Sequence, residues 1–150
     1  MPLWSVQNFS QSTPKLCWEA SARMMWQWKN KNLDGYSEKA GHYLNTDRGL
    51  TQQEMDKFYR TLGLRSLSGA EGKNLRYALQ WSPVVFTDIN KASGHAMVAT
   101  GYYNGVYTVA NPCAVMSVDF DTGADACTAG TLRRTKDQVD KPLGSYIWYW

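Results

Sequence analysis

The sequence has no strong excess of one charge and no long apolar run, and both absences exclude classes of protein. Lys and Arg number 16 against 13 Asp and Glu, which gives a net charge of +3. The basic residues are scattered along the chain, so no surface for nucleic acid or for an anionic membrane is expected. No segment approaches the ~18 apolar residues of a membrane span, and no basic start precedes an apolar run as in a Sec signal. We expect a soluble chain that is not exported by the Sec route.

Cysteine is scarce, and so are signs of a bound metal. The three cysteines are Cys17, Cys113 and Cys127, and a chain of 150 residues needs no disulfide to stabilise its core. The sequence leaves open whether Cys113 and Cys127 form a disulfide, which depends on the redox compartment. No Cys/His pair has zinc-ligand spacing, and the acidic residues 119–125 lack the glutamate that closes an EF-hand loop. We therefore expect no metal and no other cofactor.

No Pro/Gly/Ser-rich linker, low-complexity run or internal repeat divides the chain. Its length also lies within the usual range of one domain. Residues 1–150 are therefore expected to form a single domain and to act as a monomer, and this domain can be part of a longer protein.

The segment from Cys17 to Asn30 predicts a helix that begins at a cysteine. It contains neither Gly nor Pro, and its apolar residues recur at helical spacing. Pro14 is tolerated near a helix start, which places Cys17 in the first turn, where unpaired N–H groups and the helix dipole favour an anion. A cysteine attacks a carbonyl only as the thiolate. We therefore expect the helix start to lower the pKa of Cys17.

A second pattern surrounds His95 and Asn111. Residues 94–102 and 106–111 are rich in β-branched and aromatic side chains, and the intervening Asn104-Gly105 is a strong hairpin signal. His95 opens the first expected strand and Asn111 closes the second.

The register of this hairpin raises a difficulty. After a regular two-residue turn, Asn111 faces Val98, which puts His95 and Asn111 on opposite faces of the sheet. If the two side chains act together, the hairpin must contain an irregularity. We expect it between Tyr102 and Val106.

The rest of the sequence predicts helices first and antiparallel strands later, which is the α+β class. Thr51 and Glu54 form a capping box ahead of apolar residues at helical spacing, and Gly63 ends that helix. His42 lies in a polar segment and is expected at the surface. The other expected elements are helices at 37–44 and 71–80 and strands at 84–89, 116–120 and 145–150.

The fragment with Gln11, Cys17 and Trp18 resembles the active-site start of papain-like cysteine peptidases, where a glutamine, five residues, Cys-Trp, one residue and Ala follow each other. In the compact bacterial members of this family, the catalytic histidine is followed by a strand, a turn, a second strand and an Asn-Pro pair. The second half of this sequence is similar to that order. The compact members include staphopain-like effector peptidases and the leader peptidases of bacteriocin exporters. The resemblance implies a helical half that carries the Cys17 helix and packs against a C-terminal antiparallel sheet, with the cleft between them.

The resemblance also implies a role for each residue. Cys17 is the nucleophile, His95 the base, and Asn111 accepts a hydrogen bond from the imidazole. The Gln11 amide and the Cys17 backbone N–H form the oxyanion hole, and Trp18 packs at the base of the cleft, holding the helix start against the sheet. The chain departs from plant-type papains at residues 13–16, where those enzymes carry a Gly-rich turn, and at Cys113, where the family often has a tryptophan.

Each residue alone has a simpler explanation as a core cysteine, a core histidine or a turn asparagine, but all four matching residues stand in the right order. The leading hypothesis is a cysteine endopeptidase that cleaves a protein or peptide through an acyl-enzyme on Cys17. Two alternatives stay open: an amidase or transferase with the same triad, and an inactive peptide-binding module. By resemblance, we expect a bacterial effector or interbacterial toxin that acts in the cytoplasm of a target cell and is restrained by an inhibitor or immunity protein.

Overall fold

The structure is a computed structural model and describes residues 1–9, 15–89, 94–112 and 130–150. Its elements are α1 (Cys17–Asn30), α2 (Tyr36–Ala40), the 3-10 helix η1 (Gly41–Asn45), α3 (Gln52–Thr61), β1 (Arg65–Ser68), α4 (Gly72–Ala78), β2 (Val84–Asp88), β3 (His95–Tyr103), β4 (Val106–Asn111), β5 (Gly130–Thr135), α5 (Lys136–Asp140) and β6 (Tyr146–Tyr149).

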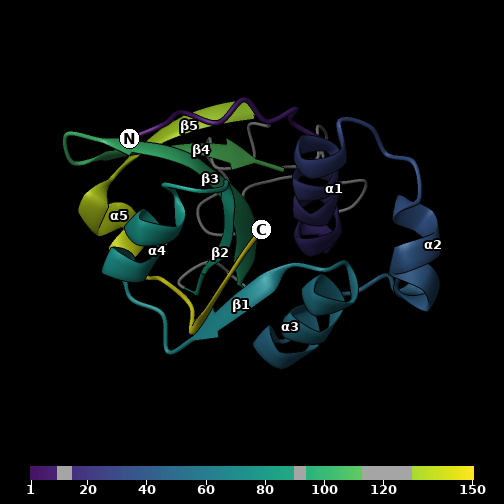
Figure 1. The fold of residues 1–150 in the computed structure, drawn as a ribbon. Coiled ribbons are helices and arrows are strands. Elements are labelled where there is room, and N and C mark those ends of the chain that lie inside the picture. The colour runs from purple at the N-terminus through teal and green to yellow at the C-terminus, as the bar shows by residue number, and fades with distance from the viewer. Residues whose placement is uncertain (10–14, 90–93, 113–129) are drawn as a thin grey trace.

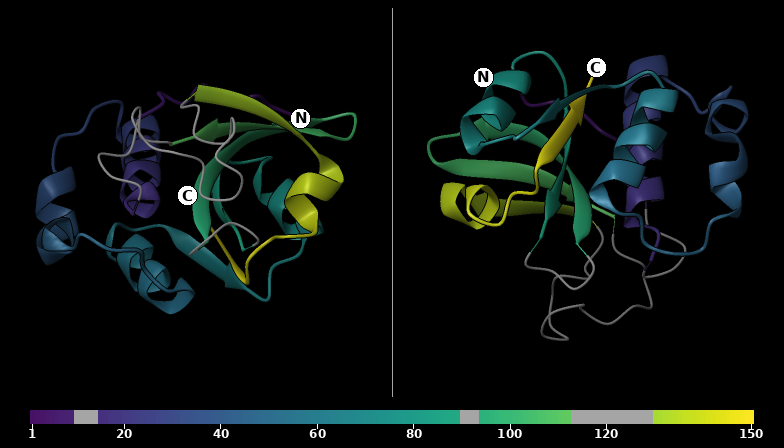
Figure 2. Two further views of the ribbon diagram at one scale, coloured as in Figure 1. Left: turned by 180° about the vertical axis from the view of Figure 1, so that it is seen from behind. Right: turned by 90° about the horizontal axis from the view of Figure 1, so that it is seen from below.

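The strands of the described part form one antiparallel sheet in the order β1-β6-β2-β3-β4-β5. Helices α1, α2 and α3 gather on one side of this sheet, and α4 and α5 on the other (Figures 1 and 2). One hydrophobic cluster joins α1 and α3 to the sheet through Val85 and Trp148, and the second joins α4 and α5 to it through Phe86 and Tyr107. The expected α+β class, with a helical half against a sheet, is confirmed.

Helix α1 has the predicted bounds, Cys17–Asn30. Most of its circumference is buried, including Ala20, Ala22 and Met25 at 0% exposure, and it packs against the sheet. Lys31 ends the helix in the left-handed region, at φ 66°. No side chain caps the N-terminus at Leu16, so the N–H groups of the first turn are available to other acceptors.

The β3–β4 hairpin contains an irregularity, but not where we expected it. The turn itself is regular, because Tyr103 pairs with Val106, and Asn104 and Gly105 adopt the positive φ angles, 52° and 80°, that a two-residue turn requires. The register shifts between Ala99 and Gly101. Thr100 is therefore the extra residue of a β-bulge.

The sequence-based elements differ from the structure at several places. The helix expected at 71–80 is the shorter α4, and the polar segment at 37–44 is α2 followed by η1. Strands β1 and β5 and helix α5 were not predicted, and the strand expected at 116–120 lies outside the described residues. Within the described ranges, no helix combines the length and the apolar content needed to cross a bilayer.

Candidate active site

The candidate site is formed at the ends of three elements, which supply Cys17, His95 and Asn111. Cys17 is the first residue of α1, His95 the first of β3, and Asn111 the last of β4. The backbone N–H of Ala96, the neighbour of His95, donates to Cys17 Sγ at 3.3 Å. His95 Nε2 lies 2.6 Å from Asn111 Oδ1. The fold thus brings together the three side chains that the sequence singled out.

The bulge at Thr100 explains why His95 and Asn111 can meet. Below the bulge Val98 pairs with Ala110, so Asn111 falls opposite Met97 rather than opposite Val98. Met97 and His95 are alternate residues of β3, and paired residues of antiparallel strands point to the same face. One extra residue therefore moves Asn111 onto the face of His95.

The hydrogen bond between His95 and Asn111 also fixes the imidazole tautomer. An amide oxygen can only accept, so Nε2 of His95 must carry the proton. In the neutral ring Nδ1 is then the basic nitrogen. Both side chains are buried, at 4% exposure for His95 and 1% for Asn111, which shields their hydrogen bond from water.

The sulfur of Cys17 occupies a position next to β3 that β4 leaves open. Ala96 pairs with Thr87 of β2, while the described pairing with β4 ends at Val98. The N–H of Ala96 donates to the sulfur instead of to a strand. The backbone N–H groups of Cys17 and Trp18 at the start of α1 also favour the thiolate, so groups from both halves of the molecule act on the sulfur.

The expected lowering of the Cys17 pKa is wrong. Burial raises the pKa of this thiol to about 11, although the hydrogen bonds from Ala96, Trp18 and Cys17 itself lower it. Cys17 keeps 8% exposure, and the loss of hydration outweighs the donors at the helix start because an anion is disfavoured where water is excluded. The sulfur retains its proton at neutral pH in this structure.

The raised pKa predicts the pH dependence of alkylation. With a pKa of about 11, the thiolate fraction at pH 7 is about 10⁻⁴, so the rate of iodoacetamide labelling of Cys17 should rise about tenfold per pH unit from 7 to 10. Mass spectrometry of the peptide that contains Cys17 measures this rate, and the same peptide in the urea-unfolded chain is the control. Fast labelling that does not change between pH 5 and 8 would show instead that His95 ionises the sulfur before any substrate binds.

Trp18 fastens the start of α1 to the α3 side of the molecule. Its indole N–H donates to the Arg48 carbonyl at 2.9 Å, and its ring meets Phe58 edge-on at 5.0 Å. Tyr59 donates to the Trp18 carbonyl at 2.8 Å. These contacts lie within the helical half, and Trp18 also belongs to the hydrophobic cluster that includes Val85 and Trp148 of the sheet. The sulfur of Cys17 also contacts the sheet.

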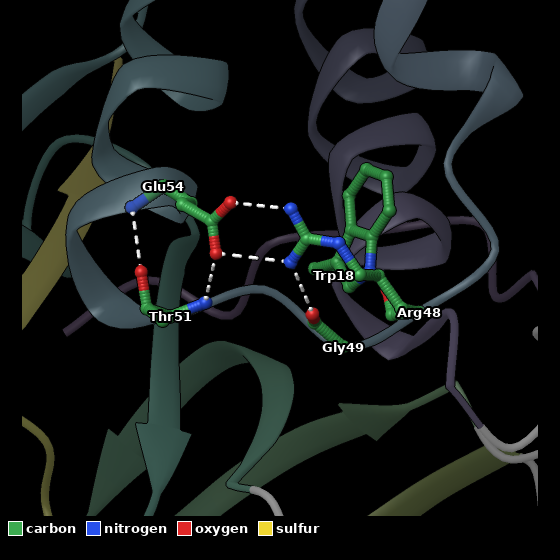
Figure 3. A network of polar contacts seen from close by, with 5 residues as sticks. All are labelled: Trp18, Arg48, Gly49, Thr51 and Glu54. Carbon is green, nitrogen blue, oxygen red and sulfur yellow. Dashed lines mark hydrogen bonds and ion pairs between the residues drawn. The ribbon is translucent and has the colours of Figure 1, made fainter.

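A polar network supports this anchor (Figure 3). Arg48 binds both carboxylate oxygens of Glu54, at 3.1 and 2.6 Å, and also donates to the Gly49 carbonyl. Glu54 and Thr51 form the predicted capping box of α3. The network therefore fixes the backbone at Arg48, which is the acceptor for Trp18.

Replacing Thr51 by Ala tests the cap. The Thr51 hydroxyl accepts from the Glu54 N–H, and the loss of such a cap is expected to lower the free energy of unfolding by about 1 kcal/mol. Urea denaturation measures the change. Thr61→Ala is the matched control, because Thr61 lies at the other end of α3, exposed, and donates only to Lys57. Equal effects of the two substitutions would contradict a role of the cap.

Of the other residues that the sequence singled out, the structure describes His42. His42 is exposed, as expected, and stacks on Tyr43 at 4.5 Å. Gln11, Cys113 and Cys127 lie outside the described residues. In the ranges that are described, no three His, Cys, Asp or Glu side chains gather as they would around a metal ion.

Sequence reasoning missed Ala96, which contributes only its backbone, and the bulge residue Thr100. Gly101 could have indicated the bulge, because a glycine inside a strand often marks a bulge or a close backbone contact.

The comparisons with known proteins concern the family and the fold of the chain. A family model described as papain-like cysteine protease AvrRpt2 matches residues 4–123, a range that contains Cys17, His95 and Asn111. A search of the curated proteins finds no match.

Solved structures share the fold at low sequence identity. The double glycine motif protease from an AMS/PCAT transporter, in complex with its leader peptide, has a TM-score of 0.62 and 16% identity, over 98% of this chain and 93% of that one. The peptidase domain of Streptococcus ComA, a bi-functional ABC transporter in a quorum sensing pathway, has a TM-score of 0.60 and 15% identity, over 97% and 96%. The Streptococcus mutans ComA domain with a small-molecule inhibitor gives 0.60 and 15%, over 95% and 96%.

Proposed function

The chain belongs to the papain-like cysteine protease AvrRpt2 family, and from that premise we propose that Cys17 is its nucleophile, His95 its general base and Asn111 the residue that orients the base. One observation carries the assignment. The 2.6 Å contact between His95 Nε2 and Asn111 Oδ1 lies directly beside the residue whose N–H holds the sulfur of Cys17. This is the arrangement that a thiol nucleophile with an oriented imidazole requires.

The chemistry follows from the tautomer and from the raised pKa. Since the sulfur is protonated at rest, His95 must take the thiol proton on Nδ1 as the sulfur attacks the scissile carbonyl. Asn111 stabilises the imidazolium through Nε2–H, and the imidazolium then protonates the leaving amine. Water hydrolyses the resulting thioester, with His95 again acting as the base.

The oxyanion of the tetrahedral intermediate needs donors near the sulfur. We assign this role to the backbone N–H of Cys17 and the side-chain amide of Gln11, by the resemblance on which the sequence pattern rests. Gln11→Ala is expected to lower kcat by about 10²- to 10³-fold with a modest change in KM, which steady-state kinetics measures. A rise in KM at unchanged kcat would assign Gln11 to substrate binding instead.

The substrate class proposed is a protein or peptide cleaved internally. Support comes from the family and from the fold shared with a double glycine motif protease that is solved with a leader peptide. We further propose that the enzyme is a bacterial effector or toxin acting in the cytoplasm of a target cell, with a separately encoded inhibitor or immunity protein covering its site. This setting rests on the resemblance to compact effector peptidases.

Three experiments test the activity and the setting. Mass spectrometry of new N-termini in cells that express the wild type or Cys17→Ala should reveal cleaved proteins only with the wild type. A peptidoglycan stem peptide and a double-glycine leader peptide, offered in parallel, distinguish an amidase or a leader peptidase from a general endopeptidase. The effector role fails if the wild type is as harmless as Cys17→Ala in both bacterial and eukaryotic cytosol.

A further inference from the structure

The N-terminal segment, residues 2–6, is attached to β3 at the bulge. The backbone N–H of Trp4 donates to the Thr100 carbonyl at 2.8 Å. Thr100 is the residue that the β3–β4 register leaves without a partner in β4, and its hydroxyl donates to the Thr108 carbonyl at 3.2 Å. The segment thus binds the carbonyl of the residue that has no partner in β4.

Gly101, the next residue of β3, shows how closely the N-terminal segment packs on this strand. A Cβ on Gly101 would stand 3.0 Å from Leu3 Cδ1 and 3.3 Å from the Pro2 carbonyl oxygen, so a side chain there would displace the segment. The Trp4 side chain fixes it at the other end. Its indole N–H donates to the Leu79 carbonyl at 2.8 Å, and its ring meets Trp28 of α1 edge-on at 5.4 Å.

An open pocket of about 280 Å³ lies between residues 3–6 and the strands β3 to β5, and Thr100, Thr108 and Ala110 line it. The hydrogen bonds of Thr100 to Trp4 and Thr108 therefore lie beside this pocket.

We propose that the N-terminal segment is a positioning element for the active site: the N–H of Trp4 stabilises the bulge at Thr100, and the bulge keeps Asn111 on the same face as His95. This inference rests on the proposed function. Without the bulge, Asn111 returns to the position opposite Val98 and its amide no longer reaches the imidazole. Trp4 acts only through Asn111 and touches neither the sulfur nor the substrate.

The comparison of Trp4→Pro with Trp4→Ala isolates the backbone donor, because both variants lose the indole and only proline lacks the N–H. We expect Trp4→Pro to have a kcat about tenfold below that of Trp4→Ala, with KM unchanged, since the loss concerns the orientation of the base. In an Asn111→Ala background the same exchange should change kcat by less than about twofold, because the residue through which Trp4 acts is gone.

A spectroscopic readout covers the case in which Trp4→Pro folds poorly. His95 and His42 are the two histidines, so the His95 ring proton on Nε2 can be assigned by NMR and reports its hydrogen bond to Asn111. Gly101→Ala, which pushes against Leu3 and Pro2, should shift or broaden this resonance toward its position in Asn111→Ala. Thr135→Ala, which removes the cap of α5 away from the bulge, is the stability-matched control and should leave the resonance in place.

The outcomes separate the inference from the proposed function. If Asn111→Ala leaves kcat unchanged, the assigned triad is wrong. If Asn111→Ala lowers kcat but the Trp4 exchange has the same effect with and without Asn111, or if Gly101→Ala leaves the His95 resonance unchanged, the positioning role of the segment is wrong while the triad stands.

Discussion

Cys17→Ala is expected to abolish peptide cleavage, with kcat falling by about 10⁶-fold, because the variant lacks the thiol that would form the acyl-enzyme. His95→Ala should fall nearly as far, since the pKa of Cys17, raised to about 11 by burial, leaves almost no thiolate without a base. Asn111→Ala should be milder, at about 10- to 100-fold, because Asn111 only orients the imidazole. Single-turnover kinetics on a peptide identified from cleaved proteins measures this series.

The relative decrease of kcat in the three variants is more informative than the decrease in any one of them. Melting temperatures provide the control, because a buried polar pair such as His95 and Asn111 also contributes to stability. Equal and complete loss in all three variants, together with lowered melting temperatures, would indicate a folding defect. A Cys17→Ala variant with residual cleavage would contradict the nucleophile assignment directly.

Trp148→Ala is expected to be the most destabilising single truncation, lowering the free energy of unfolding by about 3–5 kcal/mol. Trp148 is fully buried. Its ring lies 4.8 Å from that of Tyr59 and stacks on that of Tyr146. Its indole N–H donates to Asp56 at 2.9 Å. Truncation leaves a cavity in the cluster that joins the helical half to the sheet, and a loss of this size is a large part of the stability of a typical domain.

Trp81→Ala is the matched control for this truncation. Trp81 is 60% exposed, so the same change in chemistry should alter the free energy of unfolding by no more than about 0.5 kcal/mol. Urea denaturation of both variants makes the comparison. Similar losses for the two tryptophans would mean that the cluster around Trp148 does not hold the two halves together.

The parts of the fold that were predicted correctly have strong local signals. Helix α1 follows from an uninterrupted run with helical periodicity after Pro14, and the start of α3 from the pairing of Thr51 with Glu54. Strand β5 gave no such signal. Its sequence, GTLRRT, is polar because it lies at the sheet edge, where pairing on one side suffices to hold it.

For the candidate site, residue identity and order were sufficient to propose Cys17, His95 and Asn111, because their chemistry constrains the side chains themselves. Two properties could not be obtained in this way. The bulge at Thr100 depends on a backbone donor from Trp4, far away in the sequence. The pKa of Cys17 depends on how completely the surrounding chain excludes water, whereas the helix start alone suggested the opposite direction.

The position of β6 has a consequence for synthesis. β6 follows β1 to β5 in the chain, yet it pairs with β1 on one side and with β2 on the other. A nascent chain that lacks β6 can already pack α1 against β2 and β3, but β1 then has no neighbouring strand within the described sheet. The sheet is therefore completed only after translation has passed Trp148, and a chain stopped before β6 would leave β1 unpaired.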